Sequence, residues 1–276
     1  MKKMIRETKR LYNHVLNLIV LIKRTLDIFD SIQVDSIKFK VIPHHFWREF
    51  KKDGWEPETY NCFKKNIKDN TTFIDIGAWV GVTLIWASVL GSKKIFAIEA
   101  NPRSYKLLLK TINANDSLRE SVTILNKCIS DSSGDFVNFG KKLSSNSMIS
   151  DKGDYRVETI SLTKYLNLIK AQSNVFLKID IEGAEELIIK DLILLKNTIK
   201  DIKIFLALHP NFWKNKTLAC SEILNLGKYF KITYPSGEIM SLQRLEEMIM
   251  TENEFPEWGT SYGNLFEIML ISDKTE

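Results

Sequence analysis

Carboxylates and glycines accompany short apolar runs at several points in this sequence, a pattern typical of ligand sites in α/β proteins. Asp75 lies near the end of one run, which is followed by Gly77 and Gly81, and Glu99 ends a second run about twenty residues beyond Gly77. Glycines at a strand-to-helix turn let the backbone approach a nucleotide, and an acidic residue ending the next strand can bind ribose hydroxyls. This spacing indicates a nucleoside-binding turn.

Asp75 argues against a dinucleotide such as NAD. A dinucleotide places its pyrophosphate at this turn, where a carboxylate would repel it but could hold a cationic ligand directly or through water. S-adenosylmethionine carries a sulfonium and an amino group and no phosphate, and Glu99 could bind its ribose with charge-assisted hydrogen bonds of about 1.5 to 3 kcal/mol. We therefore expect S-adenosylmethionine as the cofactor, bound by Asp75, Gly77, Ala78, Gly81, Glu99, Ala100 and Asn101.

A third apolar run, residues 175–180, contains a lysine and an aspartate on one face. Because side chains alternate along a strand, Lys178 and Asp180 point the same way, and Asp180 emerges at the carboxyl edge of the sheet beside the glycine turn. We count Asp180 among the cofactor-binding residues as well. An unpaired buried ammonium is costly, so Lys178 should pair with Asp180, Asp75 or Glu182.

Methyl transfer to a hydroxyl requires an aligned acceptor and a base that takes its proton. The catalytic candidates are Asp180, Glu182 and His209, the last of which follows the predicted strand 202–208. The same three residues could instead bind a divalent metal that polarises the hydroxyl, a mechanism that we do not favour. Alternatively, Glu182 and Glu185 only stabilise the N-terminus of the following helix.

Three segments form a more specific pattern: Asp-Ile-Gly-Ala-Trp-Val-Gly at 75–81, Glu-Ala-Asn-Pro at 99–102 and Leu-Lys-Ile-Asp-Ile-Glu-Gly-Ala-Glu at 177–185. Together they resemble the FkbM family of S-adenosylmethionine-dependent methyltransferases, over roughly residues 55–210. The resemblance implies an O-methyltransferase whose acceptor is a sugar hydroxyl of a glycan or glycan precursor. A small-molecule or natural-product O- or N-methyltransferase, or a non-catalytic S-adenosylmethionine-binding interaction module, are the alternatives.

The resemblance also implies roles for residues outside these segments. Glu56, ahead of the glycine turn, is expected at the amino-acid end of the cofactor, or else it acts electrostatically at a helix N-terminus. Asn126 and Cys128 are expected near the adenine ring, although core packing explains Cys128 equally well. The chain departs from the family at Thr163, where relatives carry an aspartate, and at Ala207, where they carry a glutamate.

The apolar runs and the resemblance together predict an α/β fold of the class I methyltransferase type. We expect a Rossmann-like, seven-stranded, mostly parallel sheet with helices on both faces and an antiparallel last strand. The expected strands include 122–126, 229–233 and 266–272, and a helix is expected over 184–195. We also expect a loop over residues 144–147 to cover the acceptor, and Trp258 and Tyr262 to help shape its pocket.

The N-terminal part of the chain has a different pattern. Residues 1–54 are predicted to form an amphipathic helix and a short extension, and residues 55–276 the methyltransferase domain. Apolar residues spaced by three or four between Met4 and Phe29 indicate one long helix. We expect its apolar stripe to pack on the catalytic domain or on a second copy of the chain, or to dock on a membrane surface with its basic residues facing anionic headgroups.

Composition limits the remaining classes. The 276 residues suffice for one substantial α/β core. Only the first ten residues are conspicuously basic, and the other charges behind the net +5 are interspersed, so a nucleic-acid partner is not expected. Three widely spaced cysteines do not form a disulfide framework, which indicates a reducing compartment. The apolar segment 15–22 is too short to span a bilayer, and lysine and arginine stand where a signal peptide would be cleaved. We expect a cytoplasmic protein, peripheral to the membrane if the first helix docks there.

Overall fold

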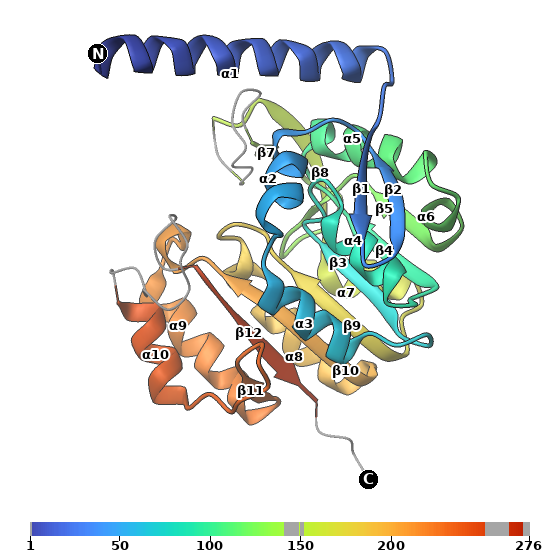
Figure 1. Ribbon diagram of the computed structural model, residues 1–276. Helices are drawn as coiled ribbons and strands as arrows, with labels where there is room; N and C mark the ends of the chain where they lie inside the picture. Colours follow the sequence, from blue (N-terminus) through green and yellow to red (C-terminus); the bar gives the residue numbers. More distant parts are fainter. Residues whose placement is uncertain (1, 141–148, 150–151, 252–264, 273–276) are drawn as a thin grey trace.

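A seven-stranded sheet forms the centre of the protein, which we describe from a computed structural model for residues 2–140, 149, 152–251 and 265–272. The strands are β3 (Thr72–Ile76), β4 (Lys94–Ile98), β5 (Val122–Leu125), β9 (Ser173–Ile179), β10 (Lys200–Leu208), β11 (Lys231–Thr233) and β12 (Phe266–Ile271). Their order is β11-β12-β10-β9-β3-β4-β5, and β12 runs antiparallel to both of its neighbours, β11 and β10, whereas the other adjacent pairs are parallel (Figure 1). The predicted fold class is therefore confirmed.

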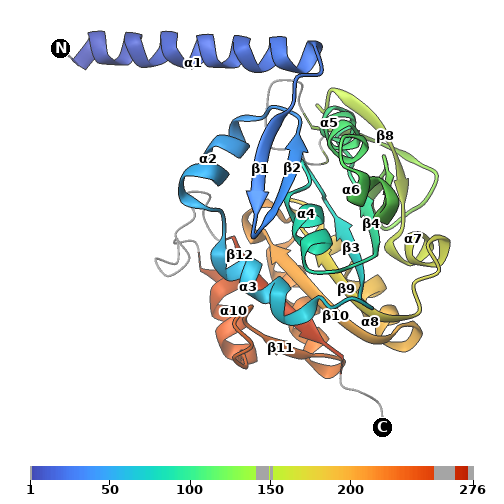
Figure 2. The same ribbon diagram turned by 45° about the vertical axis from the view of Figure 1, so that its right-hand side comes forward.

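Helices cover both faces of this sheet (Figures 1 and 2). One face carries α3 (Pro57–Asn66), α4 (Val82–Val89), α5 (Pro102–Asn113) and α6 (Asp116–Ser121), and the other carries α7 (Leu162–Leu168), α8 (Ile189–Thr198), α9 (Lys216–Asn225) and α10 (Leu242–Met250). Alternation along the strands divides the core, since Phe73 and Phe176 face the first group of helices and Ile74 and Leu177 face the second. The central strands are apolar on both faces because both are covered.

The chain before the sheet forms α1 (Lys2–Thr25), the antiparallel hairpin of β1 (Asp30–Val34) and β2 (Ile37–Val41), and α2 (His45–Asp53). The hairpin and α2 bury Ile32, Phe39 and Trp47 in the same core as α4. By contrast, the apolar stripe of α1 does not pack on the catalytic domain, because Leu18 and Ile22 are about half exposed. Of the expected sites for this stripe, only the catalytic domain is contradicted; a second copy of the chain and a membrane surface stay predictions.

A three-stranded sheet of order β6-β8-β7 lies beside the main one. It consists of β6 (Cys128–Ile129), β7 (Phe136–Phe139) and β8 (Tyr155–Ile160), with β7 and β8 antiparallel. The expected lid over residues 144–147, and Trp258 and Tyr262 with them, fall outside the described residues.

The segment after β9 differs from the helix expected over 184–195. A short 3-10 turn, η1 (Glu185–Leu187), comes first, and α8 begins only at Ile189. The physical reason is Glu185, which is 1% exposed and accepts a hydrogen bond from the backbone N–H of Gly183. This hydrogen bond stabilises the turn, and a continuous helix from residue 184 would break it. Two further 3-10 turns are η2 (Pro210–Phe212) and η3 (Leu226–Lys228).

Candidate active site

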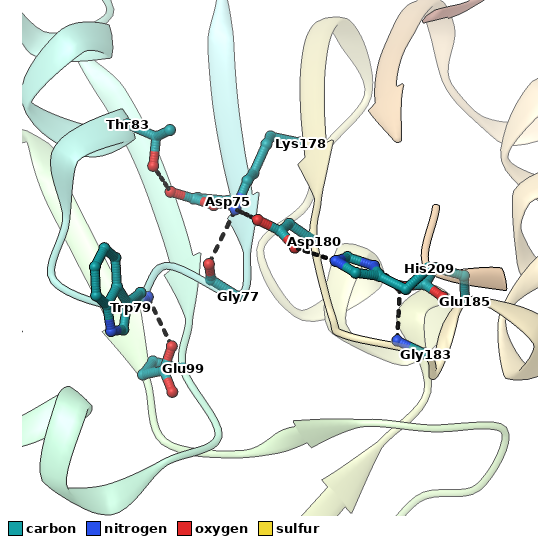
Figure 3. A network of polar contacts seen from close by, with 10 residues as sticks. All are labelled: Asp75, Gly77, Trp79, Thr83, Glu99, Lys178, Asp180, Gly183, Glu185 and His209. Atoms are coloured by element: carbon teal, nitrogen blue, oxygen red, sulfur yellow. Dashed lines mark hydrogen bonds and ion pairs between the residues drawn. The ribbon is translucent and has the colours of Figure 1, made fainter. Parts of the chain in front are cut away.

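The carboxyl ends of four adjacent parallel strands bring the predicted polar residues together (Figure 3). Gly77 follows β3, Glu99 follows β4, Asp180 follows β9 and His209 follows β10. Because parallel strands end at one edge of the sheet, residues that lie far apart in the sequence become neighbours.

Gly77 makes this close approach possible. Its φ is +84°, and a Cβ there would lie 1.9 Å from the carbonyl oxygen of Asp180. Its N–H donates to Ile98 O over 3.0 Å, so the turn is held between β4 and β9. Gly81 begins α4 with a φ of +90°, and a Cβ there would lie 2.4 Å from Leu108 Cδ1. Both glycines are required by steric limits on the backbone.

Glu99 connects the glycine turn to the loop after β4. The carboxylate is 6% exposed and accepts hydrogen bonds of 2.7 Å from the backbone N–H groups of Trp79 and Asn101. Burial raises its pKa to about 7, although those two N–H groups act in the opposite direction. Each carboxylate oxygen keeps a second lone pair that could accept from a hydroxyl.

The residues expected around the nucleoside have different local roles. Asn101 caps α5 by accepting from the N–H of Arg103, and Asn126 donates to the carbonyl oxygens of Glu99 (2.7 Å) and Ala100 (3.1 Å). Ala78 is buried in the turn, and its N–H donates to Ile98 O. These contacts fix the shape of both loops at the site.

Cys128 is buried beside the site. It is 4% exposed, packs with Phe139 and Val157, and burial, with the nearby Glu99, raises the pKa of its thiol to about 12. Its burial favours the alternative of core packing, and its expected place near the adenine stays a prediction.

Lys178 pairs with carboxylates, as predicted. Its Nζ lies 3.3 Å from Asp75 Oδ1 and 3.5 Å from Asp180 Oδ2, and it donates to Gly77 O over 3.0 Å. Burial lowers the pKa of Lys178, but the two aspartates outweigh burial and raise it to about 12. Asp75 also accepts a short hydrogen bond from Thr83 and is 0% exposed. Asp75 thus lies beneath the turn and organises it, and its burial favours the second of the two expected modes of cofactor contact, through water rather than direct.

Asp180 is the solvent-exposed residue of this group of charged side chains. Its side chain is 41% exposed, and its Oδ1 lies 3.6 Å from His209 Nε2. Burial tends to raise its pKa, but Lys178 and His209 outweigh burial and hold it below the usual range. Asp180 is therefore a fixed anion at the edge of the site, well placed to accept a hydrogen bond.

His209 is held as a cation. Its Nδ1–H donates to Glu185 Oε1 over 2.8 Å, and Glu185 Oε2 accepts from Trp213 Nε1 over 2.7 Å. Burial lowers the pKa of His209, but Glu185, Asp180 and Glu182 raise it to about 9. An imidazolium cannot accept a proton, so this environment disfavours the predicted role of base at neutral pH. Glu182 lies in the turn after β9 with a φ of +45°.

Two further carboxylates face Asp180. Glu56, at the N-terminus of α3, is an exposed residue, and its pKa is raised to about 8 by partial desolvation of its carboxyl group and by repulsion from Glu267 and Asp180. Glu267 was missed in the sequence, and burial and Asp180 raise its pKa to about 7. In the antiparallel pairing of β10 with β12, Ala207 lies opposite Glu267. In the parallel pairing of β10 with β9, Leu206 lies opposite Ile179, so the next residue, Asp180, lies beside Ala207 on its other side. The signal that could have found Glu267 is a single acidic residue inside the apolar run 266–271.

The metal alternative receives no support from side-chain geometry. Within the described ranges, no three His, Cys, Asp or Glu residues are grouped so that they could hold a metal ion.

Thr163, where the family carries an aspartate, lies at the start of α7 and donates to Asp191 of α8. That position therefore belongs to a contact between helices.

The sheet order, the glycine turn and the buried Glu99 define a class I S-adenosylmethionine-dependent methyltransferase. Residues 75–242 match the model of the methyltransferase FkbM domain, and the chain belongs to this family. None of the curated protein sequences matches it.

Solved methyltransferase structures are similar in fold. Precorrin-6y C5,15-methyltransferase from Geobacter metallireducens is 15% identical, with a TM-score of 0.42, over 80% of this chain and 90% of that one. The O-methyltransferase from Bacillus cereus in complex with SAH is 10% identical, with a TM-score of 0.43, over 94% of this chain and 91% of that one.

Proposed function

We propose that the protein transfers the methyl group of S-adenosylmethionine to a hydroxyl oxygen of a sugar, in a glycan or a glycan precursor. The observation that carries this proposal is the group of carboxylates Glu56, Asp180 and Glu267 at the edge of the sheet. Carboxylates accept hydrogen bonds from hydroxyl groups and repel polyanions, which disfavours nucleic acid as the acceptor.

The residues present fit the cofactor. Glu99 can accept hydrogen bonds from the ribose hydroxyls while it holds the N–H groups of Trp79 and Asn101. Glu56 is available for the α-amino group, because a cation there would relieve its repulsion with Glu267 and Asp180. When bound, S-adenosylmethionine supplies an activated methyl group, and the chain supplies alignment and proton transfer.

Asp180 and Glu267 are proposed to act on the acceptor. Lys178 and His209 hold Asp180 ionised, so it orients the sugar by accepting a hydrogen bond from a second, neighbouring hydroxyl. Glu267, with a pKa of about 7, accepts the hydrogen bond of the reacting hydroxyl and takes its proton as the methyl group bonds to oxygen, since a base is most effective when its pKa lies near the working pH. Ala207 between them leaves room for the acceptor atom.

An amine acceptor is the second candidate, because the same carboxylates would bind an ammonium group. It belongs with the small-molecule and natural-product alternatives, which share the cofactor site. A non-catalytic S-adenosylmethionine-binding module is the third, and Glu267 weighs against it because it offers a carboxylate next to the position where Ala207 replaces the family glutamate. We also propose a cytoplasmic location, because Cys62, Cys128 and Cys220 are all free.

The test is transfer of a labelled methyl group from S-adenosylmethionine to a panel of nucleotide sugars, cell-envelope glycans, phenols and amines. We expect a sugar to be labelled, and Glu267→Gln to lower kcat about 100-fold or more while cofactor affinity stays unchanged. Glu238→Gln, at an exposed residue, is the matched control. Labelling of amines alone would favour the second candidate, and no labelling with intact cofactor binding would favour the third.

A further inference from the structure

Helix α1 exposes an apolar stripe that the rest of the described chain leaves uncovered. The stripe consists of Val15, Leu18, Ile19 and Ile22, which are 44% to 51% exposed. Their spacing of three and four residues places them on one face of a helix about 36 Å long. Scattered exposed apolar residues are ordinary, but an aligned row of them marks an interaction surface.

The attachment of α1 leaves this face accessible. Leu16 and Val20, on the flank of the helix, are partly buried, as are Lys23 and Arg24 in its last turn. Lys23 pairs with Asp30 over 2.7 Å, and Arg24 Nε donates to Pro43 O over 2.6 Å. The C-terminal end is thus anchored, and the helix lies along one edge of the molecule in both views (Figures 1 and 2).

The charge of α1 identifies the kind of partner. Seven of its residues are lysine or arginine and one is glutamate, whereas the whole chain has a net charge of +5. The positive excess of the protein therefore resides in this helix. Two copies of such a helix would repel each other, while an anionic surface would attract it.

Positive charge continues beyond the end of the helix onto α5. Arg103 and Lys106 are exposed there, and they line a cavity of about 380 Å³ together with Arg24 and Lys110. Burial and the nearby Arg103 lower the pKa of Arg24. Lys110 pairs with Asp27.

We propose that α1 docks the protein on an anionic phospholipid membrane, with the apolar stripe inserted at the level of the headgroups and the basic residues meeting phosphate groups. An apolar face combined with excess lysine and arginine is what holds interfacial helices at such surfaces. No helix in the described part of the chain is both long and apolar enough to cross a bilayer, so α1 lies on the surface. Methyl transfer then occurs next to a membrane, independently of which acceptor is used.

Co-sedimentation of the full chain with vesicles tests this proposal. We expect binding to vesicles of phosphatidylcholine with 30% phosphatidylglycerol, little binding to pure phosphatidylcholine, and weaker binding in 0.5 M NaCl, because salt screens exposed charges. Leu18→Glu combined with Ile22→Glu should weaken binding at least tenfold. Leu194→Glu on α8 is the matched control, because Leu194 is 50% exposed, like Leu18 at 51%, and should leave binding unchanged.

Light scattering on the same variants separates a membrane from a second copy of the chain. Both charge variants are at exposed positions, so thermal unfolding should match that of the unmodified chain. The proposal is overturned if the protein does not bind anionic vesicles, if Leu194→Glu weakens binding as much as the α1 variant does, or if the chain is a dimer that the α1 variant dissociates without any vesicle binding.

Discussion

Replacing Lys178 with methionine should destabilise the fold strongly, because it removes the cation that two aspartates share. Lys178 Nζ lies 3.3 Å from Asp75 and 3.5 Å from Asp180, and Asp75 is 0% exposed. Asp75 Oδ1 has no hydrogen bond from any other described residue. Leaving one member of a buried ion pair uncompensated costs about 3 to 5 kcal/mol, which is the loss expected in the free energy of unfolding at pH 7.

Urea unfolding at 25 °C measures this loss, and a second variant shows its cause. In Lys178→Met combined with Asp75→Asn, no charge remains buried at position 75. The loss in the free energy of unfolding of the double variant should therefore be smaller, by more than about 1.5 kcal/mol, than the sum of the losses in the two single variants. The loss in Lys178→Met alone should shrink at pH 5, because burial already raises the pKa of Asp75 and protonation becomes easier.

Lys203→Met is the matched control for this series. Lys203 also lies in a central strand, β10, but it is partly exposed and has no ion pair with a described residue. Its replacement should change the free energy of unfolding by less than about 1 kcal/mol. A loss below about 1 kcal/mol in Lys178→Met, or additivity of the two single changes within about 0.5 kcal/mol, would refute the reasoning.

Two other residues give independent predictions. Glu56→Gln should weaken S-adenosylmethionine binding in calorimetry without lowering the melting temperature of the free protein, because it removes repulsion from Glu267 and Asp180; a lower melting temperature with unchanged affinity would make Glu56 structural. The pKa of His209 is raised from 6.5 to about 9, so its stabilising contribution, at most about 3 kcal/mol, is complete below pH 6.5 and lost as pH rises through 9. His209→Gln should therefore lose less stability than the unmodified chain between pH 7 and 9.5 in urea unfolding, and equal losses would contradict the charged state assigned to His209.

The sequence predicted those features that depend on local pattern. The sheet and the pairing of Lys178 follow from alternation along short apolar runs and from the cost of burying an ammonium, both of which are visible within a few residues. The position of Glu99 follows in the same way from its place at the end of β4.

Features that depend on distant segments were not predictable in this way. The charged state of His209 is set by Glu185, whose buried turn replaces the first part of the expected helix. Glu267 reaches the site only because β12 pairs antiparallel with β10, in a register that places it beside Ala207. Asp75 was predicted at the right strand end, but its burial beneath the turn depends on Thr83 and Lys178.

Calorimetric titration of Glu99→Gln with S-adenosylmethionine tests the central claim most directly. If Glu99 binds the ribose, the variant should bind about tenfold to hundredfold more weakly than the unmodified chain, as expected for the loss of charge-assisted hydrogen bonds, and NAD should give no heat with either. Equal affinity for S-adenosylmethionine in a folded Glu99→Gln variant, or binding of NAD at the same site, would contradict the account.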